Sequence, residues 1–269
     1  MKNKPLFKSI LLATALVAGS AAQAGETVKV GVVGPHQEQW EHIRDVLAPK
    51  GIDIEIVRFA DYVLPNRSLN DGETDLNSFQ TIIFLKNANK EFGFKLVPIG
   101  DTVICPLGLF SKRYKSPSEF KRGDRVAIPN DPTQGGRALK LLEAAGLIKV
   151  NPDKGFLPAV RDITENPLDL DIYEVDAANT AGLLPDVAGS VINSNYAVDN
   201  GLVPAKDAIF LEQVSPGDSG NPYVNVIAAR EDQKDRPVFA EIVKAYQSAD
   251  TAKVIHEAFK GAQIPVFKY

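Results

Sequence analysis

The chain has 269 residues, of which 44% are hydrophobic and 24% are charged, and its formal net charge is −4 at pH 7. This balance is ordinary for a globular protein and offers no basic surface, so we expect no nucleic-acid partner. The single cysteine, Cys105, excludes an internal disulfide and a zinc site built from cysteines. The histidines, His36, His42 and His256, lack the i, i+4 spacing of a metal-binding helix. We therefore predict no metal site and no cofactor.

The first 24 residues have the features of a secretory signal peptide. A basic start precedes an apolar run over residues 10–18 and a small-residue cleavage site, AQA, at 22–24. The apolar run is too short to span a membrane. We expect cleavage after Ala24 and export to the periplasm. Because no cysteine lies near the cleavage site, we also expect no lipid anchor.

Hydrophobic periodicity predicts strands and helices that alternate along the rest of the chain. Expected strands are 27–33, 52–59, 95–100, 102–112, 124–128, 170–175, 186–193 and 221–230. Expected helices are 36–51, 78–93, 133–148, 237–249 and 251–261, with a short helix capped by Asp61.

The helix predicted at 36–51 shows how these assignments are made. Trp40, Ile43, Val46 and Leu47 fall on one face of it, and Gly51 ends it.

This order of elements predicts an α/β fold with largely parallel sheets. Two extended runs, 105–113 and 221–230, lie far apart in the sequence, which suits a chain that crosses twice between two lobes. We predict lobe 1 as 25–108 plus 226–269, and lobe 2 as 109–225. Ligands of such folds bind in a crevice near strand C-termini and helix N-termini.

The segment AIPNDPTQGGRALKLLEAAGLI, residues 127–148, suggests an anion site at the start of a helix. It is not a P-loop, because its glycines are adjacent and Arg137 stands where the lysine would be. Gly135 and Gly136 would let backbone N–H groups approach a ligand, and the helix dipole favours negative charge there. Arg137 offers a planar fork that matches a carboxylate. The alternative is that Arg137 is an ordinary exposed helix residue.

Further polar and aromatic residues could complete a ligand pocket. Asn193 follows a predicted strand, and Asn225 lies inside one, where a buried amide needs partners. Tyr62, Phe79 and Phe84 could supply an apolar slot, although asparagines also cap helices and phenylalanines also fill cores. Together they describe a receptor for a small zwitterion better than an enzyme, because we find no G-x-S-x-G motif and no convincing Ser/His/Asp set.

The block IPNDPTQGGRAL and the order of other segments, such as VINSNYA and NPYVNVIAAR, carry a resemblance that covers nearly the whole mature chain. The sequence resembles the methionine-binding substrate-binding proteins of ABC importers, the NlpA-type lipoprotein family. The resemblance implies a two-lobed periplasmic-binding-protein fold, type II-like, with two crossover strands. It also implies a monomer that closes on an amino acid and then docks on a membrane permease.

Site residues carry over from the family by position. The family's carboxylate-binding arginine falls on Arg137, its pocket asparagines on Asn193 and Asn225, and its aromatic side-chain contacts on Tyr62 and Phe79. The resemblance therefore implies that the anion is the α-carboxylate of the ligand rather than a phosphate.

Residues 78–85, SFQTIIFL, depart from the family's usual F-F-Q-H-x-P-Y-L. Thr81 replaces the pocket histidine, Ile83 the proline and Phe84 the tyrosine, so the part of the pocket that discriminates between side chains is changed. The lipobox cysteine that the family usually carries is also missing.

We therefore expect a periplasmic solute-binding protein that delivers an amino acid, by default L-methionine, to an ABC importer. A receptor for another apolar amino acid or a short peptide is an alternative. An exported sensor or enzyme on the same scaffold is another.

Overall fold

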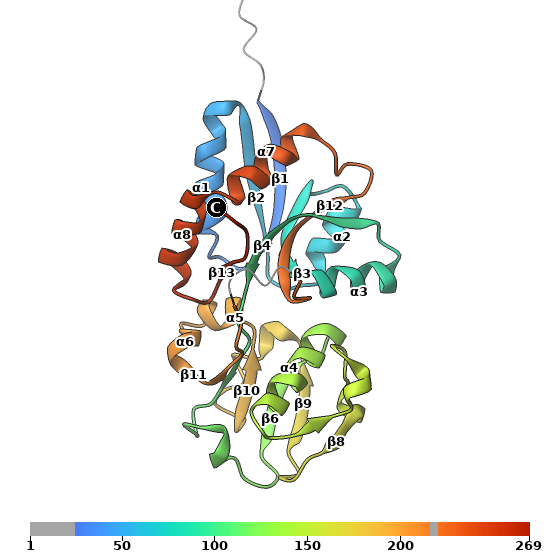
Figure 1. The fold of residues 1–269 in the computed structure, drawn as a ribbon, viewed down its shortest axis with the longest axis vertical. Helices are drawn as coiled ribbons and strands as arrows, with labels where there is room; N and C mark the ends of the chain where they lie inside the picture. Colours follow the sequence, from blue (N-terminus) through green and yellow to red (C-terminus); the bar gives the residue numbers. More distant parts are fainter. Residues whose placement is uncertain (1–24, 216–219) are drawn as a thin grey trace, which may run out of the picture.

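Two lobes, each built on its own sheet, lie one above the other in the computed structural model (Figure 1). The structure describes residues 25–215 and 220–269, so the predicted signal peptide lies outside the described residues. In the first lobe, six strands lie in the order β13-β4-β12-β3-β1-β2, and in the second, five lie in the order β11-β5-β10-β6-β9. The predicted two-lobed α/β fold is thus confirmed.

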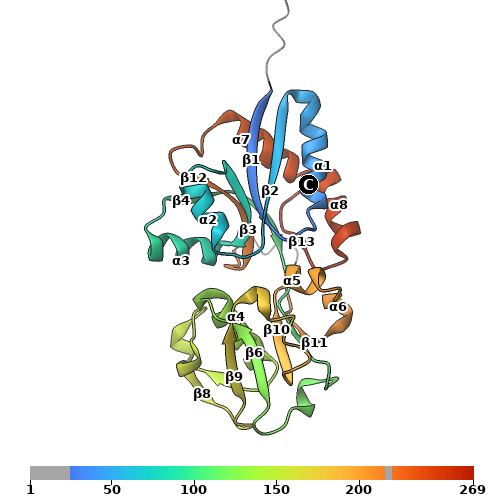
Figure 2. The same cartoon turned by 180° about the vertical axis from the view of Figure 1, so that it is seen from behind.

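The strands of the first lobe are β1 (Glu26–Val33), β2 (Ile52–Phe59), β3 (Leu76–Thr81), β4 (Leu96–Ile104), β12 (Val224–Arg230) and β13 (Ile264–Pro265). Its helices are α1 (Glu38–Leu47), η1 (Ala48–Lys50), α2 (Leu64–Asn70), α3 (Ile82–Phe92), α7 (Pro237–Tyr246) and α8 (Ala249–Phe259). Helices α1, α7 and α8 pack against one another on one face of the sheet, and α2 and α3 cover the other face (Figure 2).

Strand β12 contributes apolar side chains to the cores on both faces of the first-lobe sheet. Successive side chains of a strand point to opposite sides. Ile227 and Ala229 join the cluster under α1, α7 and α8, and Val226 and Ala228 join the cluster under α2 and α3. A strand covered on both faces has to be apolar where it is covered, as β12 is over residues 226–229.

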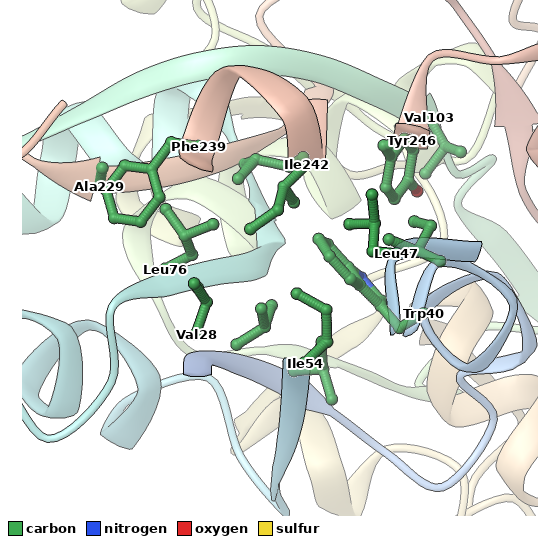
Figure 3. Close-up of a cluster of buried hydrophobic side chains, with 14 of the residues drawn as sticks. Val28, Trp40, Leu47, Ile54, Leu76, Val103, Ala229, Phe239, Ile242 and Tyr246 are labelled. Carbon is green, nitrogen blue, oxygen red and sulfur yellow. The ribbon is translucent and has the colours of Figure 1, made fainter. Parts of the chain in front are cut away.

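Trp40 lies at the centre of the larger core cluster (Figure 3). Its side chain is fully buried, and its ring lies 5.4 Å from that of Tyr246. Ile43 and Leu47 share its buried face, as predicted. Val46, which we predicted on that face, is 42% exposed. It follows Ile43 by three residues, and the turn of the helix carries it just past the edge of the apolar stripe.

The strands of the second lobe are β5 (Gly108–Phe110), β6 (Arg125–Pro129), β9 (Asp171–Val175), β10 (Gly189–Ile192) and β11 (Ala208–Leu211). A separate hairpin pairs β7 (Lys149–Val150) with β8 (Ile163–Glu165). Its helices are α4 (Pro132–Ala144), α5 (Ser194–Asp199) and α6 (Pro204–Asp207), with 3-10 turns η2 (Pro117–Glu119), η3 (Pro152–Lys154), η4 (Val160–Asp162) and η5 (Ala177–Asn179).

The sheets are mixed rather than largely parallel. β1 pairs in parallel with β2 and β3, and β6 does so with β9 and β10. The strands on either side of the crossings pair antiparallel: β12 with β3 and β4, and β5 with β10 and β11. β12, which brings the chain back into the first lobe, runs antiparallel to β4, which leads out of it. The alternation of strands and helices in the sequence does not reveal this direction.

Two predicted elements are corrected. Residues 78–81 belong to strand β3, and the helix begins only at Ile82. β3 fills the gap between β1 and β12, and this tertiary pairing overrides the local helical spacing. The strand predicted at 102–112 is broken between β4 and β5, where Pro106 cannot donate to a ladder.

No described helix has both the length and the apolar composition that crossing a membrane requires.

Candidate functional site

One cavity brings together all the side chains that the sequence predicted for the site: Tyr62, Phe79, Thr81, Phe84, Arg137, Asn193 and Asn225. It lies between the two lobes, and its interior space that a water-sized sphere can reach is about 80 Å³. Residues of both lobes line this space, so a ligand held there would contact both lobes.

Aromatic rings form one wall of the cavity. The ring of Tyr62 lies 5.9 Å from that of Phe79, 6.1 Å from that of Phe84 and 5.0 Å from that of Tyr196. Tyr62 follows β2 in the first lobe, whereas Tyr196 lies on α5 in the second. The rings of Tyr62, Phe79 and Phe84 offer apolar contacts to a ligand side chain, and Tyr196 of the second lobe packs against Tyr62.

Thr81 stands where β3 ends and α3 begins. Its hydroxyl accepts a hydrogen bond from the backbone N–H of Phe84 at 3.3 Å, so it caps the helix. Thr81 is buried, and its strand neighbour in register is Asn225 on β12. The residue that departs from the family pattern therefore has a structural role as well as a place in the cavity wall.

Two asparagines of the second lobe leave polar atoms without partners. Asn193 lies between β10 and α5 and donates from Nδ2 to Gln134 Oε1 at 2.8 Å. Its Oδ1 is buried and has no hydrogen-bond partner among the described residues. Asn195 Oδ1 accepts from the Tyr62 hydroxyl at 2.5 Å, and its Nδ2 is likewise buried and unpaired within the described chain. Such atoms are costly to bury, so they indicate a place for a polar ligand.

Asn225 and Cys105 meet at the end of the cavity formed by the first lobe. Asn225 Nδ2 lies 3.8 Å from Cys105 Sγ. Burial raises the pKa of the Cys105 thiol to about 12. The thiol therefore stays neutral, whereas a reactive cysteine needs its thiolate form.

The N-terminus of α4 is not the open anion site that the sequence suggested. Asp131 Oδ1 accepts from the backbone N–H groups of Thr133 at 3.1 Å and Gln134 at 2.9 Å. Burial raises the pKa of the Asp131 carboxyl, and these hydrogen bonds act against that rise. The N–H groups that a ligand would have used are taken by this N-cap.

The glycine pair of α4 also has a different role from the predicted one. A Cβ on Gly135 would lie 2.7 Å from the Pro129 carbonyl oxygen, and one on Gly136 would lie 2.9 Å from that of Phe156. The glycines therefore let the helix pack closely against neighbouring backbone rather than against a ligand.

Arg137 is buried at the cavity wall, with 3% of its side chain exposed, and is not an exposed helix residue. Its Nε donates to Glu212 Oε1 at 3.0 Å, and its Nη2 donates to Glu212 Oε2 and to the Cys105 carbonyl oxygen. Its guanidinium carbon lies 4.4 Å from the centre of the Tyr223 ring. The fork that was expected to hold a ligand carboxylate is thus engaged by a carboxylate of the chain itself.

Several residues of the site were not predicted: Gln37, Gln39, Gln134 and Glu212. Gln134 precedes Arg137 by three residues, a spacing that places both on one helix face, so it could have been found. Glu212 lies 75 residues from Arg137, and no local pattern links them.

Among residues 25–215 and 220–269, no group of histidine, cysteine and acidic side chains is arranged to hold a metal ion.

The chain matches known proteins in sequence along most of its length. The profile of the NlpA lipoprotein family matches residues 28–267. The D-methionine-binding lipoprotein MetQ of Yersinia pestis is 42% identical over 269 residues, which cover 96% of this chain and 97% of MetQ.

Solved structures agree with the sequence match. A nutrient binding protein from Burkholderia cenocepacia, solved bound to methionine, superposes with a TM-score of 0.84 at 42% identity, over 89% of this chain and 100% of that one. The substrate binding protein of a methionine transporter from Streptococcus pneumoniae gives a TM-score of 0.84 at 36% identity, over 90% and 96% of the two chains. The fold, the sequence profile and the relatives agree over nearly all of the described residues. The chain therefore belongs to the NlpA lipoprotein family.

Proposed function

We propose that this protein is a periplasmic solute-binding protein that captures an amino acid, methionine by default, and delivers it to an ABC importer. The observation that carries the proposal is the cavity between the lobes. It joins a buried guanidinium, unpaired amide atoms and an aromatic wall. The relatives described above, one of them solved bound to methionine, support the ligand class.

The cavity suggests how an amino acid would be oriented. The α-carboxylate would meet Nη1 of Arg137, the guanidinium nitrogen that Glu212 and Cys105 leave free among the described residues. The ammonium group would donate to the unpaired Oδ1 of Asn193. The side chain would then lie against the rings of Tyr62, Phe79 and Phe84.

We propose that the two lobes close around the ligand. The predicted bounds, 25–108 plus 226–269 and 109–225, shift by one or two residues, because Gly108 belongs to β5 and Val224 and Asn225 belong to β12. Tyr62 of the first lobe donates to Asn195 of the second, and the Tyr196 hydroxyl donates to the Ala60 carbonyl oxygen at 3.3 Å. Burial raises the pKa of Tyr62 well above its ordinary value, so its hydroxyl remains a donor. These contacts between the lobes would favour the closed form and would be broken on opening.

We further propose export with cleavage after Ala24 and no lipid anchor, which rests on the sequence alone. A mass of the exported protein equal to that of residues 25–269, without added diacylglycerol, is the expected result.

Calorimetric titration of ligand-free protein tests the proposed ligand class. We expect L-methionine or D-methionine to bind, with a dissociation constant in the micromolar range or tighter, since an amide, guanidinium and aromatic site encloses the ligand. Leucine, norleucine and short peptides such as glycylmethionine complete the panel. Failure of every panel member to bind would contradict the proposal.

Thr81→His is expected to shift the preference toward methionine. A ring placed at the cavity wall can contact the thioether sulfur, a contact worth about 0.3–1.5 kcal/mol, or roughly two- to tenfold in affinity. The measured quantity is the ratio of Kd values for norleucine and methionine. Thr81→Ser is the matched control, because it keeps the hydroxyl that caps α3. An unchanged ratio in Thr81→His would mean that residue 81 does not set specificity.

A further inference from the structure

Arg137 has only part of its hydrogen-bonding capacity left for a ligand. A guanidinium carries five N–H donors: one on Nε and two on each Nη. Nε is used by Glu212 Oε1, and the two donors of Nη2 are used by Glu212 Oε2 and the Cys105 carbonyl oxygen. The two donors of Nη1 remain. A ligand carboxylate would therefore meet Arg137 through one nitrogen rather than through the two-nitrogen fork.

Glu212 is itself held in place by the backbone of Leu107. Its Oε2 accepts from the backbone N–H of Leu107 at 3.0 Å, and its own N–H donates to the Leu107 carbonyl oxygen at 2.9 Å. Leu107 lies in the first crossing between the lobes, and Glu212 follows β11 at the start of the return. The carboxylate therefore cannot swing away easily to make room for a ligand carboxylate.

The charge of the cavity depends on this pair. Arg137 is the one formally charged side chain among the described residues that line the cavity, where the other polar groups are amides, hydroxyls and a thiol. Glu212 lies directly behind Arg137, with 19% of its side chain exposed. Because the pair is mostly removed from water, the two charges offset each other with little screening. The positive charge of Arg137 is therefore largely neutralised by Glu212 before any ligand enters.

We propose that Glu212 makes the site selective for zwitterions over anions, by offsetting the charge of Arg137 and occupying its fork. An amino acid brings an ammonium group as well as a carboxylate, so its net charge matches a neutral cavity. An anion without the ammonium enters the same cavity with an uncompensated charge, and its desolvation is not offset. The inference rests on the proposed function and extends it to Glu212, which pairs with Arg137 and is not itself expected to contact the ligand.

The experiment compares an amino acid with its 2-hydroxy acid, which has the same side chain and carboxylate but no ammonium. Methionine and 2-hydroxy-4-(methylthio)butanoate are the pair, or the tightest amino acid of the panel and its hydroxy analogue. The ratio of their Kd values isolates the ammonium group, because everything else is common to both ligands. We expect Glu212→Gln to shift this ratio about tenfold or more toward the hydroxy acid, since the ammonium then meets an unbalanced guanidinium.

Two further variants separate charge from shape. Glu212→Asp keeps the charge, so its ratio should stay within about threefold of wild type even if both ligands bind more weakly. Glu165→Gln removes an equal charge from an exposed pair with Lys149, and it should leave both affinities unchanged. Circular dichroism shows whether each variant is folded. Should Glu212→Gln not fold, the wild-type ratio decides, because a hydroxy acid that binds within threefold of its amino acid would mean that the site does not select zwitterions.

The outcomes distinguish the inference from the function on which it rests. A wild-type protein that binds methionine, with a ratio that Glu212→Gln leaves within threefold, overturns the role of Glu212 and leaves the proposed function intact. A wild-type protein that binds no member of the panel overturns the proposed function, and the inference with it.

Discussion

Arg137→Ala is expected to weaken binding of the amino acid by about 2–5 kcal/mol, or roughly 30- to several-thousand-fold in Kd. The variant removes the cation that the ligand carboxylate would meet. It also leaves Glu212 next to the cavity without its partner, so a negative charge faces the incoming carboxylate. Both effects act against binding, and titration calorimetry with L-methionine measures their sum.

Arg125→Ala is the matched control for that variant. Arg125 lies on β6 in the same lobe and pairs with Asp171 at 2.7 Å, but the pair is about half exposed. Exposed pairs contribute about 0–1 kcal/mol, and this one is not part of the cavity wall. Ligand affinity should therefore be unchanged. If Arg137→Ala also bound within threefold of wild type, the assignment of the carboxylate to Arg137 would be wrong.

Trp40→Ala is expected to lower the free energy of unfolding by about 3–5 kcal/mol. Trp40 is fully buried at the centre of the first-lobe core and packs on Tyr246 (Figure 3). Truncation removes its contacts with several elements and leaves a large cavity that a close-packed core cannot fill. Chemical denaturation of ligand-free protein, followed by circular dichroism, measures the loss.

Two controls on helix α1 show whether packing is the cause. Trp40→Phe keeps an aromatic ring beside Tyr246 and removes an indole Nε1–H that has no partner among the described residues, so it should cost less than Trp40→Ala. Val46→Ala changes a side chain that is 42% exposed on the same helix, and it should change stability by less than about 0.5 kcal/mol. A loss below about 1 kcal/mol for Trp40→Ala would contradict the packing described here.

Local patterns were enough to find most elements of the fold. The apolar run of β1, the spacing of Trp40, Ile43 and Leu47 on α1, and the stop at Gly51 all hold, the last because Gly51 has a φ of 75°. These features depend on residues close together in the sequence. β3 was missed because its residues carry a helical spacing, while its place in the sheet depends on pairing with β1 and β12.

The same distinction holds for the site. The predicted residues come together at one cavity, yet the role given to the α4 N-terminus was wrong, because Asp131 caps it. An N-cap aspartate just before the helix is visible in the sequence, so this correction was within reach. The pairing of Arg137 with Glu212 was not, because it depends on the place of β11 beside β5 in the sheet of the second lobe, which brings together residues 75 apart in the sequence.

Native mass spectrometry of protein purified from the periplasm, followed by denaturing extraction of any released small molecule, tests the central proposal most directly. We expect a bound mass equal to that of methionine or another apolar amino acid, held in the cavity between the lobes. Recovery of a ligand of another class, such as a phosphorylated compound or a sugar, would contradict an amino-acid receptor built around Arg137 and Asn193.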